Sequence, residues 1–173
     1  MSIELRPVRP ADAAALAAFY NGLSEASKRT FRPIGVTTTA EKCSEMIGQN
    51  APEVAKKHDI VACDGPNIVG WGFLWDLHAG APTLGLGVAD AYQGRGLGSA
   101  LMDRLLAFAV QQKIRHVKLT VVQDNEKAWR MYERRGFINE ESMVGSDGLP
   151  YFYMVADLSD RIAEAERPPA PGP

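Results

Sequence analysis

The chain has 173 residues, of which 46% are hydrophobic and 23% charged, and its formal net charge is -2 at pH 7. These are globular proportions, and the length suits one domain with a sizeable buried core. The small net charge gives no electrostatic reason to expect nucleic acid or an anionic membrane as a partner.

The N-terminus lacks the apolar run of a signal peptide, and no stretch approaches the roughly 20 apolar residues of a membrane span. Cys43 and Cys63 lie in unrelated segments without metal-ligand spacing. We therefore expect no metal site and a cytoplasmic location, where cysteines stay reduced. A disulfide between the two cysteines stays open as an alternative.

Strand and helix patterns alternate along the chain and predict a single α/β domain over residues 1–160. A Pro-rich tail at 161–173 is expected to be disordered after about Ala165. In chain order we expect a strand at 3–8, a helix at 11–23 capped by Asp12, a loop at 24–39 with a short helical turn as an option, a helix at 39–50 capped by Thr39, a hairpin with strands at 59–64 and 68–79, a strand at 83–88, a helix at 97–113, a strand at 116–122, a helix at 125–135 closed by Gly136, and a hairpin at 137–158.

Three glycines stand between the strand at 83–88 and the following helix, in the stretch Gln93-Gly94-Arg95-Gly96-Leu97-Gly98. Backbone N–H groups at the start of a helix attract phosphate, and glycine lets the ligand approach closely. The stretch lacks the lysine of a Walker-type loop, and Ser99 stands where a dinucleotide fingerprint needs glycine. A purely structural turn remains the alternative to a phosphate site.

This stretch resembles the Q-x-x-G-x-G signature of the GNAT superfamily of N-acetyltransferases. Downstream, "NEKAWRMYERRGF" is similar to a second motif of that family, with an Asn after the fifth strand and a Tyr on the next helix. The order of elements from Ile3 to Leu158 also resembles the family's topology. The resemblance therefore covers nearly the whole chain.

The resemblance implies a mixed, twisted central sheet of six to seven strands, splayed between strands 4 and 5 and flanked by about four helices. It further implies acetyl-CoA as co-substrate, with its diphosphate on the glycine loop and its pantetheine arm along the splayed strand. The cofactor-binding residues would be Leu86, Val88, Gln93, Gly94, Arg95, Gly96, Leu97, Gly98, Ser99, Asn125 and Tyr132. We expect a bulge at the splay to explain Gly85 and Gly87.

Asn125 and Tyr132 are seven residues apart, about two helical turns, so both face one side of a helix. Asn125 can bind the pantetheine amides, cap the helix, or do both. We expect Tyr132, with an unshifted pKa near 10, to protonate the leaving thiolate. Core packing is the alternative for Tyr132. The resemblance places the N–H of Val88 at the thioester carbonyl, where it would stabilise an oxyanion.

The acceptor side is less defined. The resemblance implies that residues 24–31 and the last hairpin shape acceptor specificity, but no residue there is decisive. Many relatives carry a Glu on the fourth strand as the base, whereas residues 81–84 read Ala-Pro-Thr-Leu, which favours a water relay. Asp76 and His78 are candidate bases, and solvated hairpin residues are the alternative. The other acceptor candidates, each with solvation or core packing as its alternative, are Glu25, Trp75, Glu140 and Glu141.

The expected function is N-acetyl transfer from acetyl-CoA to a primary amine of a small molecule or a protein, by direct attack in a ternary complex. Neither cysteine is placed to act as an acyl-enzyme nucleophile. The alternative is a catalytically silent coenzyme A-binding regulatory module, which the missing carboxylate favours. We expect neither nucleic acid nor membrane as a partner, and a homodimer is one option.

Overall fold

The computed structural model describes residues 2–170. In chain order its elements are β1 (Glu4–Pro7), a 3₁₀ turn (Pro10–Asp12), α1 (Ala13–Asn21), α2 (Glu25–Thr30), α3 (Ala40–Gly48), β2 (Lys57–Asp64), β3 (Asn67–Trp75), β4 (Thr83–Val88), a second 3₁₀ turn (Asp90–Tyr92), α4 (Leu97–Gln111), β5 (His116–Val122), α5 (Glu126–Glu133), β6 (Phe137–Val144), β7 (Pro150–Asp157) and α6 (Ser159–Ala165).

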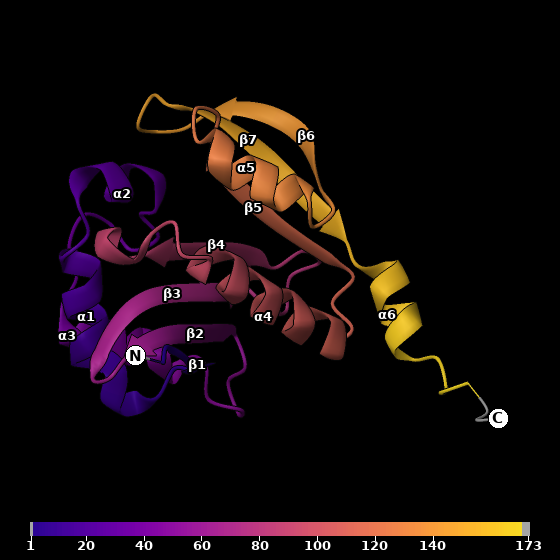
Figure 1. Ribbon diagram of the computed structural model, residues 1–173, viewed down its shortest axis with the longest axis horizontal. Helices are drawn as coiled ribbons and strands as arrows, with labels where there is room; N and C mark the ends of the chain where they lie inside the picture. Colours follow the sequence, from indigo (N-terminus) through magenta and orange to yellow (C-terminus); the bar gives the residue numbers. More distant parts are fainter. Residues whose placement is uncertain (1, 171–173) are drawn as a thin grey trace.

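The described strands form one seven-stranded sheet in the order β1-β2-β3-β4-β5-β7-β6. Every neighbouring pair is antiparallel except β4 and β5, which are parallel. Figure 1 shows β5, β7 and β6 turning away from β4, so the sheet opens in its middle. This confirms the predicted mixed α/β class and the splay between the fourth and fifth strands.

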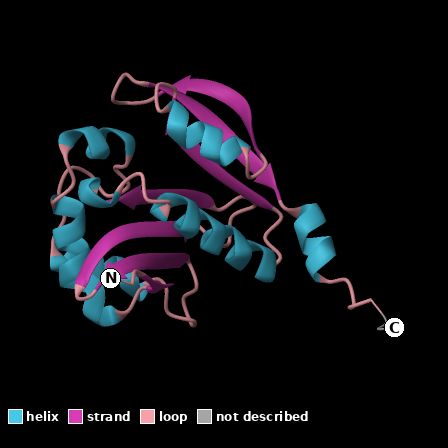
Figure 2. Ribbon diagram, viewed as in Figure 1, coloured by secondary structure: helices cyan, strands magenta, loops and turns pink. Residues whose placement is uncertain are grey.

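Apolar side chains fill both faces of the sheet. On one face, α1 and α3 pack on β2 and β3 through a cluster that includes Leu16, Tyr20, Met46 and Trp71. On the other face, α4 packs on the sheet through residues such as Leu101 and Leu105. Leu101, Leu105 and Ala109 recur every four residues, so they form one buried stripe along α4. In Figure 2 the helices lie on both faces of the strands.

One of the two predicted helix caps is confirmed, and the other is wrong. Thr39 caps α3 as expected, because its hydroxyl accepts from the N–H of Lys42 at 3.3 Å. Asp12 precedes α1 but makes no side-chain bond to that helix. Its carboxylate instead binds the Arg6 guanidinium at 2.7 and 2.9 Å, and this pairing lowers the pKa of Asp12. The stronger, charged partner therefore takes the side chain away from its expected capping role.

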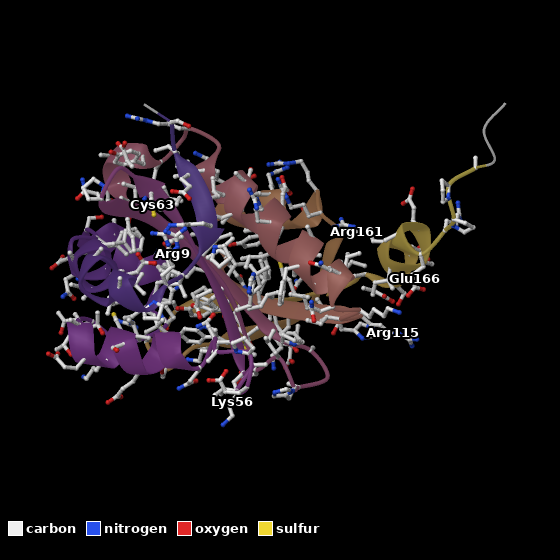
Figure 3. The ribbon with its side chains drawn as sticks, turned by 90° about the horizontal axis from the view of Figure 1, so that it is seen from below. Arg9, Lys56, Cys63, Arg115, Arg161 and Glu166 are labelled. Carbon is white, nitrogen blue, oxygen red and sulfur yellow. The ribbon has the colours of Figure 1, made fainter. Side chains whose placement is uncertain are left out.

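Two short helices lie where the sequence signals are weak. Residues 25–30 form α2, which corresponds to the short helical turn allowed for the loop at 24–39. At the other end, α6 ends at Ala165, the residue after which disorder is expected, and Ile162 packs on the core. The Arg161 guanidinium donates to the carbonyl of Arg135 at 2.8 Å, and Figure 3 shows Arg161 on this helix. Residues 171–173 of the expected tail lie outside the described range.

Across residues 2–170, no helix combines the length and apolar character needed to cross a membrane. The same residues contain no group of three or more His, Cys, Asp or Glu side chains arranged to hold a metal ion.

Candidate active site

The site begins where β4 and β5 separate. Their recorded register contains a single pair, Thr83 with Lys118, where the N–H of Lys118 donates to the carbonyl of Pro82 at 2.9 Å. Beyond this point β4 continues for five residues, from Leu84 to Val88. These five residues pair with β3 and not with β5. One edge of β4 therefore faces the opening.

The peptide groups on that edge can be identified from the ladder. The N–H of Ala89 donates to the Val69 carbonyl, on the β3 side, at 2.9 Å. Because bonding direction alternates along a strand, Gly85 and Gly87 also bond toward β3, and Leu86 and Val88 point toward β5. The N–H groups of Leu86 and Val88 therefore face the opening between the strands.

The β3–β4 register is continuous, so the expected bulge at Gly85 and Gly87 is wrong. Aromatic rings explain both glycines. A Cβ on Gly85 would stand 2.3 Å from the ring of Phe73, and one on Gly87 would stand 2.3 Å from the ring of Phe31. The rings lie directly on the strand, and only glycine leaves room for them.

The glycine loop leads from β4 into α4. Gly94 and Gly96 have φ of +74° and +80°, a conformation that L side chains rarely adopt. Nothing lies within 4 Å of the position that a Cβ would take on either residue. The first N–H bond of the helix is that of Ala100 to the Gly96 carbonyl at 3.0 Å. The preceding N–H groups of Leu97 to Ser99 therefore have no acceptor within the helix.

This arrangement fits a diphosphate. The space before the amides is open, the donors converge at a helix start, and the helix dipole favours negative charge there. Gln93 fixes the loop, as expected: its Nε2 donates to the carbonyl of Val88 and to the hydroxyl of Ser27, both at 3.0 Å. Gln93 therefore ties the start of the loop to the end of β4 and to α2.

Across the opening, α5 presents Asn125 and Tyr132. Asn125 precedes the helix, but its side chain makes no capping bond and lines the cavity instead. Tyr132 is 8% exposed, and burial raises its pKa to about 12. The expectation of an unshifted pKa is therefore corrected, because the phenol lies in an apolar environment. Its proton stays in place at neutral pH, which is the form that a general acid requires.

The end of β4, the glycine loop and α5 together line one cavity of about 470 Å³. Every residue expected to bind the cofactor lines it except Arg95, whose guanidinium lies 5.2 Å from the ring centroid of Tyr92. The residues that sequence reasoning missed are Leu23, Ala26, Ser27, Thr30, Phe31, Gly87, Asp90, Tyr92, Thr120, Val121, Lys127, Ala128 and Met131. Five of these come from α2 and its flanks, and four of the five lie within residues 24–31, the segment that the resemblance assigns to acceptor specificity without pointing to a residue.

The expected acceptor residues do not reach the cavity. Trp75 stacks on Phe73 with ring centroids 4.0 Å apart, and Asp76 and His78 follow it in the turn before β4. That turn lies at the Thr83 end of β4, whereas the cavity lies at the Val88 end, roughly 16 Å away at 3.3 Å per residue. Glu25, Glu140 and Glu141 are exposed and do not line the cavity.

Asp90 is the one carboxylate among the described lining residues. Its oxygens accept from the Ser24 hydroxyl at 2.6 Å, the Ser27 hydroxyl at 2.8 Å and the Ser24 N–H at 3.1 Å. These bonds lower the pKa of Asp90, the Ser24 hydroxyl contributing most. A carboxylate with a lowered pKa and three donors is a poor proton acceptor.

Comparison with known proteins agrees with this geometry. The sequence model of the Acetyltransferase (GNAT) family matches residues 23–137, more than half of the chain. A mycothiol acetyltransferase of Corynebacterium aurimucosum is 36% identical over 42% of this chain and 32% of its own length. This chain thus spans about a third of that relative.

Two solved structures share the fold. An acetyltransferase of the GNAT family from Streptococcus pneumoniae superposes with a TM-score of 0.77 at 24% identity, over 90% of this chain and 99% of that one. A Salmonella typhimurium structure solved with its cofactor acetyl-CoA has a TM-score of 0.75 at 21% identity, over 91% and 95% of the two chains. The family match and the shared fold together show that this chain belongs to the acetyltransferase (GNAT) family.

Proposed function

We propose that this protein transfers an acetyl group from acetyl-CoA to a primary amine of a small molecule or a protein, by direct attack in a ternary complex. One observation carries the proposal: a single cavity joins the amide cluster at the start of α4 to the unpaired edge of β4. The first feature suits a diphosphate and the second suits an extended chain of amides. Coenzyme A contains both groups in series.

The chain's residues divide the binding between them. Amides from Arg95 to Ser99 would hold the diphosphate oxygens, and Leu86 and Val88 would pair with the pantetheine arm as a strand pairs with an edge. The side chain of Asn125, which makes no capping bond, would bind a pantetheine amide from the α5 side. The acetyl-CoA bound to the Salmonella protein supports the same co-substrate here.

Two groups would act on the thioester. The N–H of Val88 would donate to the carbonyl oxygen as negative charge develops there. Tyr132 would give its phenolic proton to the departing sulfur. Its pKa of about 12 makes it a weaker acid than a solvated tyrosine, but the burial that raises this pKa would also raise the proton affinity of a thiolate held beside the phenol.

Direct attack is supported by the positions of the cysteines. Cys43 is fully buried on α3, and Cys63 lies on β2 opposite Glu4 of β1. Neither lines the cavity. Both are free thiols, as in a reducing cytosol, which supports the cytoplasmic location proposed with this activity.

The amine must lose a proton before or during attack. Asp90 is engaged by three donors, and the candidates Asp76 and His78 lie at the far end of β4. We therefore propose that water in the cavity relays this proton to solvent. This assignment predicts that no single carboxylate variant among the described residues abolishes turnover.

The test is a panel of primary amines, from polyamines and amino acids to peptides, with acetyl-CoA and thiol release as the readout. Turnover that needs both substrates and yields an acetylated amine in mass spectrometry supports the proposal. Thiol release with no amine dependence contradicts it.

The absence of a carboxylate on β4 and the engagement of Asp90 favour a second candidate, a silent coenzyme A-binding module. The two differ in one measurement. Such a module binds acetyl-CoA in calorimetry yet releases no thiol with any amine of the panel.

A further inference from the structure

The short helix α2 forms one wall of the cavity without being packed into the core. Ala26, Ser27 and Thr30 line the cavity, and none of the six residues Glu25–Thr30 is buried. An element with few buried apolar contacts opens at low free-energy cost unless other interactions hold it. The position of α2 therefore depends on its polar contacts.

A chain of hydrogen bonds joins the start of α2 to the glycine loop. The Nε2 of Gln93 donates to the hydroxyl of Ser27 at 3.0 Å, and that hydroxyl donates to Asp90 at 2.8 Å. The hydroxyl and N–H of Ser24 also donate to Asp90. Figure 1 places α2 next to the segment between β4 and α4, as these contacts require.

The groups at the two ends of this hydrogen-bond chain decide which atoms donate and which accept. The second bond of the Gln93 amide goes to the carbonyl of Val88, which can only accept, so the contacting atom must be the NH₂ group. Asp90 is ionised and can also only accept. Ser27 must therefore accept from Gln93 and donate to Asp90, using its only hydroxyl proton. No other arrangement satisfies all four groups.

The far end of α2 is held independently. Arg29 forms a two-pronged ion pair with Asp124 at 2.8 and 3.1 Å, and Phe31, directly after the helix, is buried in the core. Loss of the Ser27 hydroxyl would consequently break the link from Gln93 to α2, while the bonds of Ser24 to Asp90 and the contacts at the end of the helix remain.

We propose that Ser27 is a positioning residue that couples the cofactor loop to α2, so that coenzyme A on the loop holds the wall of the acceptor side in place. The inference rests on the proposed coenzyme A site. A phosphate held by the loop amides fixes the backbone of Gln93, and Gln93 then holds Ser27. Ser27 itself touches neither reacting group in this proposal.

Such coupling is reciprocal: if coenzyme A stabilises α2 by some factor, an ordered α2 strengthens coenzyme A binding by the same factor. One net hydrogen bond changes an equilibrium by about fivefold, which corresponds to about 1 kcal/mol. Ser27→Ala should therefore weaken coenzyme A binding and reduce the coenzyme A-induced protection of α2, each by about fivefold. If Ser27 only stabilised the local structure, the loss of affinity and the loss of protection would not have to be equal.

The experiment measures hydrogen–deuterium exchange at the amides of residues 28–31 with and without saturating coenzyme A, and coenzyme A affinity by calorimetry. Ser27→Thr keeps the hydroxyl and should retain both effects. Ser44→Ala, an exposed serine on α3 outside the cavity, is the matched control. Asp90→Ala removes the acceptor of Ser24 as well as that of Ser27, so it should weaken both effects at least as much as Ser27→Ala does.

The outcomes separate the two proposals. If wild-type protein does not bind coenzyme A, the proposed function fails. If wild type binds but Ser27→Ala shows unchanged affinity or unchanged protection of α2, the coupling proposal alone is overturned. Losses of affinity and protection by similar factors in Ser27→Ala, losses at least as large in Asp90→Ala, and none in Ser44→Ala support it.

Discussion

The ring of Phe73 lies directly against the backbone of Gly85, at a distance that leaves no space for a Cβ. That Cβ would stand 2.3 to 2.9 Å from three atoms of the ring. Phe73 cannot move aside freely, because it is 4% exposed and stacks on Trp75. The contact fixes the strand that lines the opening of the sheet.

Gly85→Ala is therefore expected to destabilise the protein by about 1–3 kcal/mol, the usual range for overpacking a core. The free energy of unfolding in urea measures this loss. Gly80→Ala is the matched control, since no atom lies within 4 Å of its Cβ position and its φ is not positive. A loss in Gly85→Ala no greater than in Gly80→Ala would contradict the packing explanation.

The sequence predicted the fold because its signals are local. Strand alternation, the Thr39 cap and the glycine loop each act within a few residues, and the structure follows them. The glycine stretch at 93–98 and the second motif at 125–137 also predicted one side of the cavity. Every predicted cofactor-binding residue except Arg95 lines it.

The features that could not be predicted depend on contacts between residues far apart in the sequence. Gly87 is explained by Phe31, which lies 56 positions earlier in the chain. The start of α2 is held by Asp90, which stands 66 positions after Ser24. Residues 25–30 bury nothing, so they carry no apolar period to reveal a helix. The family resemblance assigns residues 24–31 to the acceptor side, but their helix and its attachment to Asp90 are visible only once the chain is folded.

Gly96→Glu should weaken acetyl-CoA binding by about 100-fold or more in calorimetry, because its carboxylate would occupy the open space and repel the phosphates. Gly148→Glu is the control: its φ of +79° and empty surroundings match those of Gly96, but it lies in the β6–β7 turn outside the cavity. Both variants strain the backbone, so only the difference between them reports on the site. Equal binding by the two would remove the phosphate assignment.

Tyr132→Phe should lower turnover by about 100-fold, the scale of general-acid catalysis, while acetyl-CoA affinity stays within about threefold. The phenol is buried and burial alone raises its pKa, so its loss should not destabilise the fold. Tyr153→Phe, outside the cavity, should leave both values unchanged. Weaker binding with full turnover would show that Tyr132 holds the cofactor and does not supply the proton.

The buried ring of His58 should make the free energy of unfolding depend on pH. Its ring stacks on Phe108 with centroids 3.6 Å apart, and burial lowers its pKa from 6.5 to about 4. Between these two values the unfolded chain binds a proton that the folded protein does not, so unfolding becomes easier as pH falls. Above pH 6.5 this contribution to stability is fully present, and it is lost as pH falls toward about 4.

His58→Phe keeps an aromatic ring on Phe108 and removes the proton, so its free energy of unfolding should decline less than that of wild type between pH 6.5 and 4. Urea titrations at several pH values across this window measure the slope. His78→Gln is the control, because His78 is exposed in the turn before β4 and should leave the wild-type slope in place. If His58→Phe keeps that slope as well, the acid sensitivity must come from carboxylates, because the buried imidazole would then contribute nothing to it.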